Sequence, residues 1–349
     1  MIKKKICQQI HKKLNGITIE EYIKICLYHK EGYYSKINPL GPSGDFITAP
    51  EISQLFGEIL GLFIFYLWKK KFNKPINLIE LGPGKATLLI DILRITKNFS
   101  NFNNSLKIHL IEKNNTLIKL QKKIFNSEFF SSYKISWSKK FKEISNEPVI
   151  IYANEFFDCL PIRQFQKKKI SWYEKKINFN TKEDKLYTKD ILVKNTKILS
   201  LLNKKGEGNI LEISQEREKY FQKLCIYVKK VKGFIIIIDY GYYDSPESFT
   251  LQAIYNNKLS HVLENSGMQD ISSLVNFKDL IKIAQKNYLK IHTFCTQRDF
   301  LLSHGIKERK NKILKKCKIK NQKIIKQEFE RLIDINNMGS YFKVLVISS

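Results

Sequence analysis

Acidic side chains follow three separate apolar runs of this 349-residue sequence. Glu80 and Glu112 lie in IEL and HLIE, and Asn154, Glu155 and Asp158 come directly after PVIIYA. Carboxylates and an amide gathered at one place can bind a cationic or hydroxyl-bearing ligand and can orient a positively charged nucleophile. The spacing therefore predicts a ligand site with a reaction centre beside it.

The stretch Glu80-Leu81-Gly82-Pro83-Gly84-Lys85-Ala86 joins an apolar run to a helical pattern. Glycine allows a tight turn and leaves room for a ligand close to the main chain. The N-terminus of the following helix offers free N–H groups. Ala86 stands at the third small position and still permits close packing of helix on strand. This corner is predicted to bind a cofactor.

The chemistry of that cofactor follows from the two acids. An acid at the tip of a second strand, here Glu112, hydrogen-bonds ribose hydroxyls. Glu80 would face a pyrophosphate badly and suits an amino-bearing ligand, so a dinucleotide is disfavoured. S-adenosylmethionine carries an α-amino group, a sulfonium and a ribose. The alternative is that Glu80 and Glu112 only cap strand ends.

The residues Asn154-Glu155-Phe156-Phe157-Asp158 follow a predicted strand, at the edge where open α/β sheets bind ligands. They distantly resemble the Asn-Pro-Pro-Tyr signature of amino methyltransferases acting on adenine or glutamine, without the prolines. An exposed acidic turn is the alternative. Asp239 ends an Ile-rich run and either lines a substrate cleft or terminates its strand.

Strand-like runs alternate with helical patterns over much of the chain, which indicates a doubly wound α/β sheet. The predicted strands are INLIEL, KIHLIE, PVIIYAN, GFIIIIDYG, IHTFCTQ and YFKVLVIS. We expect residues 71–349 to form this Rossmann-like core. Two insertions, at about 163–232 and 242–289, interrupt it; the first contains a hairpin around ISWYEKKINFN and a helix from about Ser214, and the second a loop and a further helix.

Residues 1–70 are expected to form a helical region and a loop that covers the site. Thr18 and Glu21 form a capping-box pattern before IEEYIKICLYH. A buried helix is predicted for PEISQLFGEILGLFIFYLW, with its proline in the first turn. The polar residues of the covering loop and the next helical turn are Asp45, Thr48, Glu51 and Gln54. A packed surface loop is the alternative for them.

The formal charge of +28 would suit nucleic acid. However, 55 of the 61 basic residues are lysines, which are spread along the chain without an RNA-binding motif, so we expect codon bias and no nucleic-acid partner. The six cysteines and six histidines lack metal-ligand spacing. The longest apolar run, 59–68, is too short to span a membrane. We expect a cytoplasmic protein without a metal.

With these elements placed, the chain resembles the MidA-type class I methyltransferases, a family that includes the mitochondrial complex I assembly factor. The matching stretches are GYY, GDFITAPEISQLFGE, IELGPGKATLLIDILR, HLIE with the later Gln121, ANEFFDCLPIRQF, DYGY, LQAI, TQRDFLLSHGI and MGSYFKVLVIS. The chain departs from the family at Ala49, Lys85-Ala86 and Cys159. The largest departure is at Leu274 and Asn276, where the family has a His and an Asp.

The resemblance implies an S-adenosylmethionine-dependent protein arginine methyltransferase that makes symmetric dimethylarginine, with a core respiratory complex I subunit as the eukaryotic substrate. The cofactor residues are then Glu80, Gly82, Pro83, Gly84, Glu112 and Asn154, and the catalytic residues are Glu155, Asp158 and Asn154. Two alternatives stay open: an assembly factor that binds cofactor without turnover, which Leu274 and Asn276 support, and an RNA methyltransferase, which the charge supports.

Overall fold

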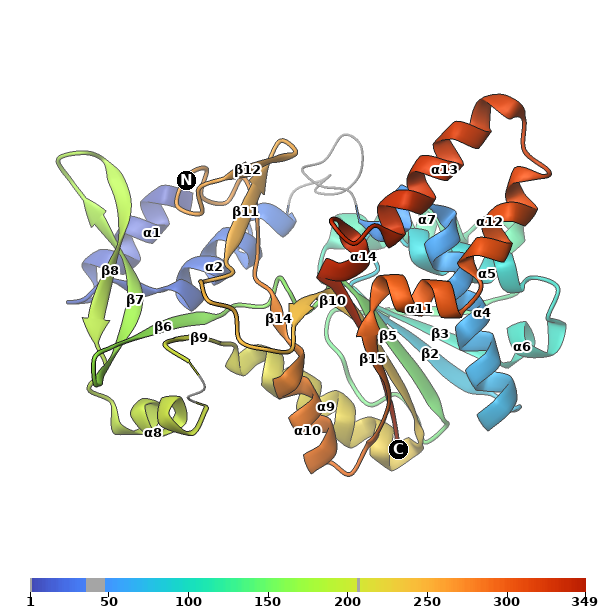
Figure 1. Ribbon diagram of the computed structural model, residues 1–349, viewed down its shortest axis with the longest axis horizontal. Coiled ribbons are helices and arrows are strands. Elements are labelled where there is room, and N and C mark those ends of the chain that lie inside the picture. Colours follow the sequence, from blue (N-terminus) through green and yellow to red (C-terminus); the bar gives the residue numbers. More distant parts are fainter. Residues whose placement is uncertain (1, 36–47, 206–207) are drawn as a thin grey trace. The chain divides into compact units, whose positions relative to one another are not determined.

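The computed structural model describes residues 2–35, 48–205 and 208–349. The chain divides into two compact units, each assembled from separated segments (Figure 1). Unit 1 consists of Met1–Phe46, Phe157–Tyr220 and Tyr242–Lys278, and unit 2 of Ile47–Phe156, Phe221–Gly241 and Asp279–Ser349. The predicted division into residues 1–70 and 71–349 stays a prediction.

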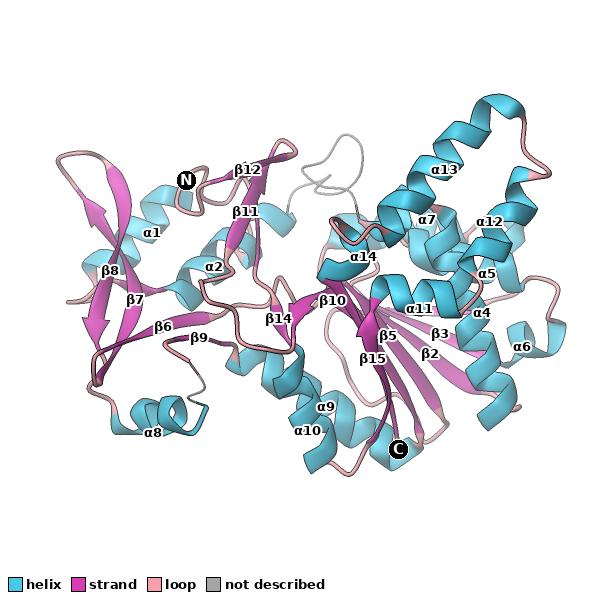
Figure 2. Ribbon diagram, viewed as in Figure 1, coloured by secondary structure: helices cyan, strands magenta, loops and turns pink. Residues whose placement is uncertain are grey.

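Unit 2 is built on a mixed sheet, drawn in magenta in Figure 2, whose strands follow the order β15-β16-β10-β5-β2-β3-β4. The strands are β2 (Ile76–Leu81), β3 (Leu106–Ile111), β4 (Lys134–Ser138), β5 (Val149–Asn154), β10 (Gly233–Tyr242), β15 (Lys290–Thr296) and β16 (Phe342–Ser348). Strands β4, β3, β2, β5 and β10 pair in parallel, and β16 is antiparallel to both of its neighbours. The six strands predicted from apolar runs are confirmed.

The centre of this sheet is buried because its strands are apolar on both faces. The side chains of β2 and the Ile run of β10 are buried along nearly their whole length. The helices of unit 2 are α3 (Ala49–Ile52), α4 (Gln54–Lys71), α5 (Thr87–Thr96), α6 (Ser100–Ser105), α7 (Asn115–Phe125), α11 (Gln297–Ser303), α12 (Ile306–Leu314), α13 (Ile319–Ile333) and α14 (Met338–Tyr341). Two further helices run from one unit's segments into the other's, α9 (Gln215–Val231) and α10 (Phe277–Lys286).

The buried helix predicted from Pro50 to Trp68 is interrupted, which corrects the sequence interpretation. Helix α3 ends at Ile52, and Ser53 adopts an extended conformation with φ −154°. Its hydroxyl accepts a hydrogen bond from the Leu55 amide and caps α4. The side chain of a serine can bind main-chain groups that a continuous helix would use, and such a bond favours a break in the helix. Hydrophobic periodicity does not reveal this break.

Unit 1 combines helices with two small antiparallel sheets. One sheet has the order β1-β7-β6-β9 with β8 beside β7, and the other has the order β12-β11-β13. Its elements are α1 (Ile2–His11), β1 (Ile17–Thr18), α2 (Ile19–Tyr28), η1 (Tyr33–Ser35), β6 (Arg163–Lys168), β7 (Ser171–Asn180), β8 (Lys185–Leu192), α8 (Thr196–Lys205), β9 (Ile210–Ile213), β11 (Gln252–Tyr255), β12 (Lys258–Ser260), β13 (Asp270–Ser272) and β14 (Val275–Asn276).

Two local predictions for unit 1 can be compared with these elements. The capping box is present: the Thr18 hydroxyl accepts the Glu21 amide at 3.1 Å, and the Glu21 carboxylate accepts the Thr18 amide at 2.9 Å. The segment 242–289, predicted as loop and helix, also contains β11, β12 and β13, because strands of three or four residues show no periodicity. Within the described residues, no helix is long and apolar enough to cross a membrane.

Candidate active site

The parallel register of unit 2 brings the predicted site residues to one edge. Leu81, the last residue of β2, is level with Ile111 of β3 on one side and with Ala153 of β5 on the other. The residues that follow these positions are Gly82, Glu112 and Asn154, so the three separate sequence stretches meet at the carboxyl ends of adjacent strands. This edge is where ligands bind in open α/β sheets.

The glycine corner between β2 and α5 has the main-chain conformation that its sequence predicts. Gly82, Gly84 and Ala86 have positive φ angles of 65°, 56° and 65°. A Cβ atom at Gly82 would lie 2.9 Å from the Phe156 ring, which is too close for any other side chain to fit without displacing that ring. The corner is therefore bare by steric necessity and leaves its main chain accessible to a ligand.

Glu80 lies inside the sheet at the end of β2 and is only 3% exposed. The Tyr152 hydroxyl of β5 donates a 2.9 Å hydrogen bond to its Oε2 atom. Burial raises the pKa of Glu80 to about 8; the Tyr152 bond acts in the opposite direction, and the charge of Glu112 raises the pKa further. An approaching cation would favour the ionised form, so this acid fits the amino group of a ligand.

Glu112 follows β3 directly and is 9% exposed. Its carboxylate accepts the Asn114 amide at 2.8 Å, and main-chain hydrogen bonds from Lys113 and Gly84 also reach it. Burial raises the pKa of Glu112, and these three bonds partly oppose that shift. The bond to Gly84 ties the predicted ribose-binding acid directly to the glycine corner.

Two residues that the sequence interpretation did not assign to the site support the glycine corner through hydrogen bonds. The buried Gln121 of α7 donates from Nε2 to the Gly84 carbonyl at 2.7 Å, and Trp137 of β4 donates to Gln121 Oε1 at 2.9 Å. Gln121 was named with one of the stretches that resemble the family, but its neighbours in the sequence did not indicate a contact with Gly84. Tyr152 was also missed, although a hydroxyl within a buried apolar strand is a usable signal because it needs a partner.

Glu155 is the second residue of the predicted reaction segment and has a positive φ of 50°, which is strained for a residue with a side chain. Its Oε1 atom accepts hydrogen bonds from the Ala49 amide at 3.2 Å and from Asn154 Nδ2 at 3.0 Å. The Asn154 Oδ1 atom is buried and accepts no hydrogen bond from the described residues. Strained backbone and an unmatched acceptor at a sheet edge mark a functional site.

Asp239 follows the same pattern one strand further along. Ile238 of β10 is level with Asn154, so Asp239, which lies within β10, follows the position opposite the end of β5, where Glu155 begins the connecting segment. Asp239 is fully buried, and its Oδ2 atom accepts the Phe156 amide at 3.2 Å. The side chain therefore holds the main chain of the reaction segment. Its predicted role in lining the substrate cleft stays a prediction.

Of the four polar residues predicted for the covering loop and the next helical turn, the structure describes three. Asp45 lies outside the described residues. Thr48 precedes α3, and Gln54 is exposed at the start of α4. Glu51 of α3 forms an ion pair with Lys85 of the glycine corner at 3.6 Å. Burial raises the pKa of Glu51, and the charge of Lys85 lowers it. This pair connects α3 to the corner; the covering role stays a prediction.

Asp158 belongs to unit 1, whereas Glu155 belongs to unit 2. The half-buried Asp158 has its main-chain carbonyl bound by the Ser273 amide at 3.0 Å. The pairing of Asp158 with Glu155 on one substrate group stays a prediction.

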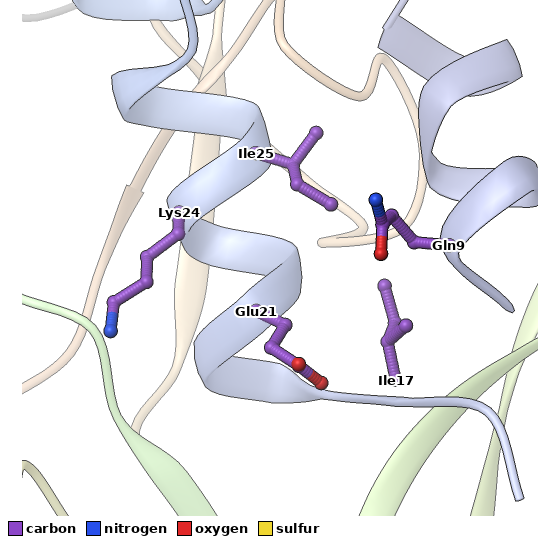
Figure 3. Close-up of a pocket in the computed structure, with 5 residues that line it drawn as sticks. All are labelled: Gln9, Ile17, Glu21, Lys24 and Ile25. Carbon is purple, nitrogen blue, oxygen red and sulfur yellow. The ribbon is translucent and has the colours of Figure 1, made fainter. Parts of the chain in front are cut away.

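A surface pocket of about 200 Å³ lies in unit 1 and is lined by Gln9, Ile17, Glu21, Lys24 and Ile25. Figure 3 shows these five side chains. None of the predicted site residues lines the pocket. Its charged side chains are already engaged, since Glu21 closes the capping box and Lys24 pairs with Glu20 at 2.6 Å. Among the residues described, no group of three or more His, Cys, Asp or Glu side chains is arranged to hold a metal ion.

The donor set at the sheet edge fits a nucleoside that carries a positive charge. Glu80 offers a buried acid to a cation, Glu112 offers a fixed carboxylate to hydroxyl groups, and Asn154 offers an unmatched carbonyl. Lys85, the basic residue of the corner, forms an ion pair with Glu51 at 3.6 Å. A pyrophosphate would therefore meet acids rather than cations. The residues present fit S-adenosylmethionine.

Comparison with known proteins points the same way. Residues 59–295 match a family described as "Putative S-adenosyl-L-methionine-dependent methyltransferase". A relative from Caenorhabditis elegans, named protein arginine methyltransferase NDUFAF7 homolog, mitochondrial, is 31% identical over 92% of this chain and 79% of its own length. The zebrafish (Danio rerio) protein arginine methyltransferase NDUFAF7, mitochondrial, is 29% identical over 98% and 86%.

A solved structure from Burkholderia thailandensis, bound to S-adenosyl-homocysteine, covers 100% of this chain and 92% of its own. Its TM-score is 0.86 at 19% sequence identity, which establishes a shared fold. The fold expected from the alternation of strands and helices is thereby confirmed.

Proposed function

Because the chain belongs to the family of S-adenosyl-L-methionine-dependent methyltransferases, we propose that it methylates arginine side chains of a protein substrate. The enzyme class and the cofactor follow from membership of the family. The acceptor is the proposed part, and the names of the relatives, protein arginine methyltransferase, support it. The symmetric dimethylarginine product and a complex I subunit as substrate stay predictions.

The single observation that carries the proposal is the state of Glu155. Its carboxylate is held by Ala49 and Asn154 at the carboxyl end of β5, and its main chain is strained. A fixed carboxylate at that edge suits a guanidinium, which is planar and presents several N–H donors. Strain at this residue, at a cost of about 1–3 kcal/mol, is consistent with a position retained for function.

The chemistry requires control of the acceptor nitrogen. S-adenosyl-L-methionine supplies a methyl group on a sulfonium, which leaves as a neutral sulfide when a nucleophile displaces it. An arginine side chain is a weak nucleophile because it is protonated below a pKa of about 12.5 and its lone pairs are delocalised. Hydrogen bonds from the guanidinium to Glu155 would orient one nitrogen toward the methyl carbon. That nitrogen loses one proton as the bond to the methyl carbon forms and the bond to sulfur breaks, and the carboxylate would stabilise the single positive charge that the product keeps.

The neighbouring residues have supporting tasks in this scheme. Asp239 holds the Phe156 amide and so fixes the segment after Glu155. Asn154 donates from Nδ2 to Glu155, and its carbonyl remains for the cofactor or the substrate. Asp158 is the second carboxylate that we propose to bind the guanidinium.

The cytoplasmic location expected from the sequence stays a prediction.

The test is methyl transfer from labelled S-adenosyl-L-methionine into a lysate that lacks this protein, with and without ribonuclease. A ribonuclease-resistant protein band whose hydrolysate contains methylated arginine is the expected result. Label that disappears with ribonuclease would establish an RNA acceptor and overturn the proposal. Cofactor binding without any transfer would favour the assembly factor that does not turn over.

A further inference from the structure

Arg217 is a buried cation in unit 1 that the proposed mechanism does not use. It lies in the first turn of α9 and is 6% exposed. Its guanidinium donates from Nε to the Phe157 carbonyl at 2.9 Å, from Nη1 to the Leu274 carbonyl at 3.2 Å and from Nη2 to Ser273 Oγ at 3.1 Å. All three nitrogen atoms thus bind the main chain or a hydroxyl of two other segments.

Ser273 extends this network to the predicted catalytic acid. Its amide donates to the Asp158 carbonyl at 3.0 Å, and its hydroxyl donates to the same carbonyl at 3.4 Å. The carbonyls of Phe157 and Asp158 are therefore both held, the first directly by Arg217 and the second through Ser273. The peptide that carries the Asp158 side chain cannot rotate without breaking these bonds.

The burial of its charge makes Arg217 an unfavourable choice for a purely structural contact. Within residues 2–35, 48–205 and 208–349 its guanidinium forms no ion pair, and the three acceptors of its hydrogen bonds are neutral. Burying a charge without a counter-charge is unfavourable, and an apolar side chain of similar volume would avoid that cost. A conformational requirement at the bound segments explains why a guanidinium stands here, because only its fork reaches three acceptors at once.

We propose that Arg217 is a positioning residue that fixes the main chain at Phe157 and Asp158 and thereby restricts the Asp158 carboxylate to the orientation that methyl transfer requires. The inference rests on the proposed function, because it assigns Asp158 to the acceptor. The same guanidinium also holds the carbonyl of Leu274, in the segment that follows β13. Arg217 therefore joins the segment at Ser273 and Leu274 to the segment that bears the acid.

The test uses four variants of the full chain: Arg217→Met, Arg217→Lys, Asp158→Asn and the double variant Arg217→Met with Asp158→Asn. Release of S-adenosyl-homocysteine gives kcat and the KM for each substrate. We expect Arg217→Met to lower kcat at least about tenfold with an unchanged KM for the cofactor, and Arg217→Lys to restore part of that loss. On the Asp158→Asn background, Arg217→Met should add little, since both changes remove the same function.

Tyr22→Phe is the matched control, because it removes a buried hydrogen bond to a main-chain carbonyl in the same unit. The Tyr22 hydroxyl donates to the Val262 carbonyl at 2.7 Å and lies 2.8 Å from Ser266 Oγ. Its kcat should stay close to that of the parent protein. Full additivity of Arg217→Met with Asp158→Asn, or an equal loss in Tyr22→Phe, would overturn the inference.

A second measurement separates this inference from the proposed function. Hydrogen exchange of peptides that cover residues 156–160 and 272–275 should become faster in Arg217→Met than in Tyr22→Phe. Unchanged exchange there contradicts the inference even if no turnover is found. Analysis of the acceptor decides the proposed function separately: a methylated product other than arginine would overturn that function while the coupling between Arg217 and Asp158 could still hold.

Discussion

The Tyr152 hydroxyl donates a 2.9 Å hydrogen bond to Oε2 of Glu80 in the interior of the sheet, where the two residues are 1% and 3% exposed. The bond joins neighbouring strands, because β2 and β5 pair in parallel with Glu80 level with Tyr152. An acid of the cofactor site is thus oriented by a residue of the hydrophobic core. Two of the predictions that follow test this relationship.

Glu80 should make the stability of the ligand-free protein depend on pH. Burial raises its pKa from 4.5 to about 8 in the folded state. Between these values the folded protein keeps a proton that the unfolded chain has lost, so stability falls as pH rises, by up to about 1.4 kcal/mol per pH unit from this group. Chemical denaturation of the parent protein and of Glu80→Gln at several pH values measures this dependence of the free energy of unfolding on pH. A difference between them that does not change from pH 5 to pH 8 would contradict the assignment.

Tyr152→Phe should weaken cofactor binding. Without the hydroxyl, ionised Glu80 loses a hydrogen bond worth about 1–2 kcal/mol, so we expect the Kd for S-adenosyl-L-methionine to rise about 5- to 30-fold. Titration calorimetry gives the value. Tyr227→Phe is the control in the same unit, since its hydroxyl donates to the Ser145 carbonyl at 3.1 Å. Equal losses of affinity in the two variants would mean that the effect is general and unrelated to Glu80.

Gly84→Val should abolish cofactor binding and leave the fold largely intact. Gly84 has a φ of 56°, and a branched side chain would both strain the turn and cover the main chain at the corner. Gly305→Val is the control for strain alone: Gly305 has a φ of 88°, and a Cβ there meets nothing closer than Glu308 at 3.6 Å. Each change should cost about 1–3 kcal/mol of stability. Normal cofactor affinity in Gly84→Val would refute the role of the corner.

Glu155→Gln should retain cofactor affinity and lose methyl transfer by about a hundredfold or more, because the amide keeps the shape of the side chain without the charge that orients a guanidinium. Single-turnover transfer and equilibrium binding of the cofactor, measured on the same preparation, distinguish the two effects. Glu20→Gln, which removes a carboxylate from a surface ion pair with Lys24, is the control. An active Glu155→Gln enzyme would remove Glu155 from the reaction.

Gln121→Leu should raise the Kd for the cofactor about tenfold. The change removes the donor to the Gly84 carbonyl and leaves Trp137 without its acceptor, so the corner loses the support that holds it from behind. Gln297→Leu is a close control, since the buried Gln297 of the same unit donates to the Leu332 carbonyl at 2.9 Å. If both variants lose stability equally and neither loses affinity, Gln121 has no part in cofactor binding.

Sequence patterns were sufficient to predict six strands of the central sheet, although not β4, and the edge at which the cofactor site lies. The physical reason is local: an unbroken apolar run such as that of β10 suits only a strand covered on both faces, and Gly82 and Gly84 suit only a tight, bare turn. Parallel pairing then places the residues after Leu81, Ile111 and Ala153 at one edge, so Glu80, Glu112 and Glu155 were recognisable without coordinates.

Only the tertiary structure decided which side chains hold these residues in place. Tyr152 reaches Glu80 across 72 positions, and Arg217 reaches Phe157 across 60. Gln121 is 37 positions from Gly84. Such contacts depend on which elements become neighbours after folding, and hydrophobic periodicity carries no information about them. The positive φ of Glu155 is of the same kind, because contacts from Ala49 and Ile238 hold a conformation that its local sequence disfavours.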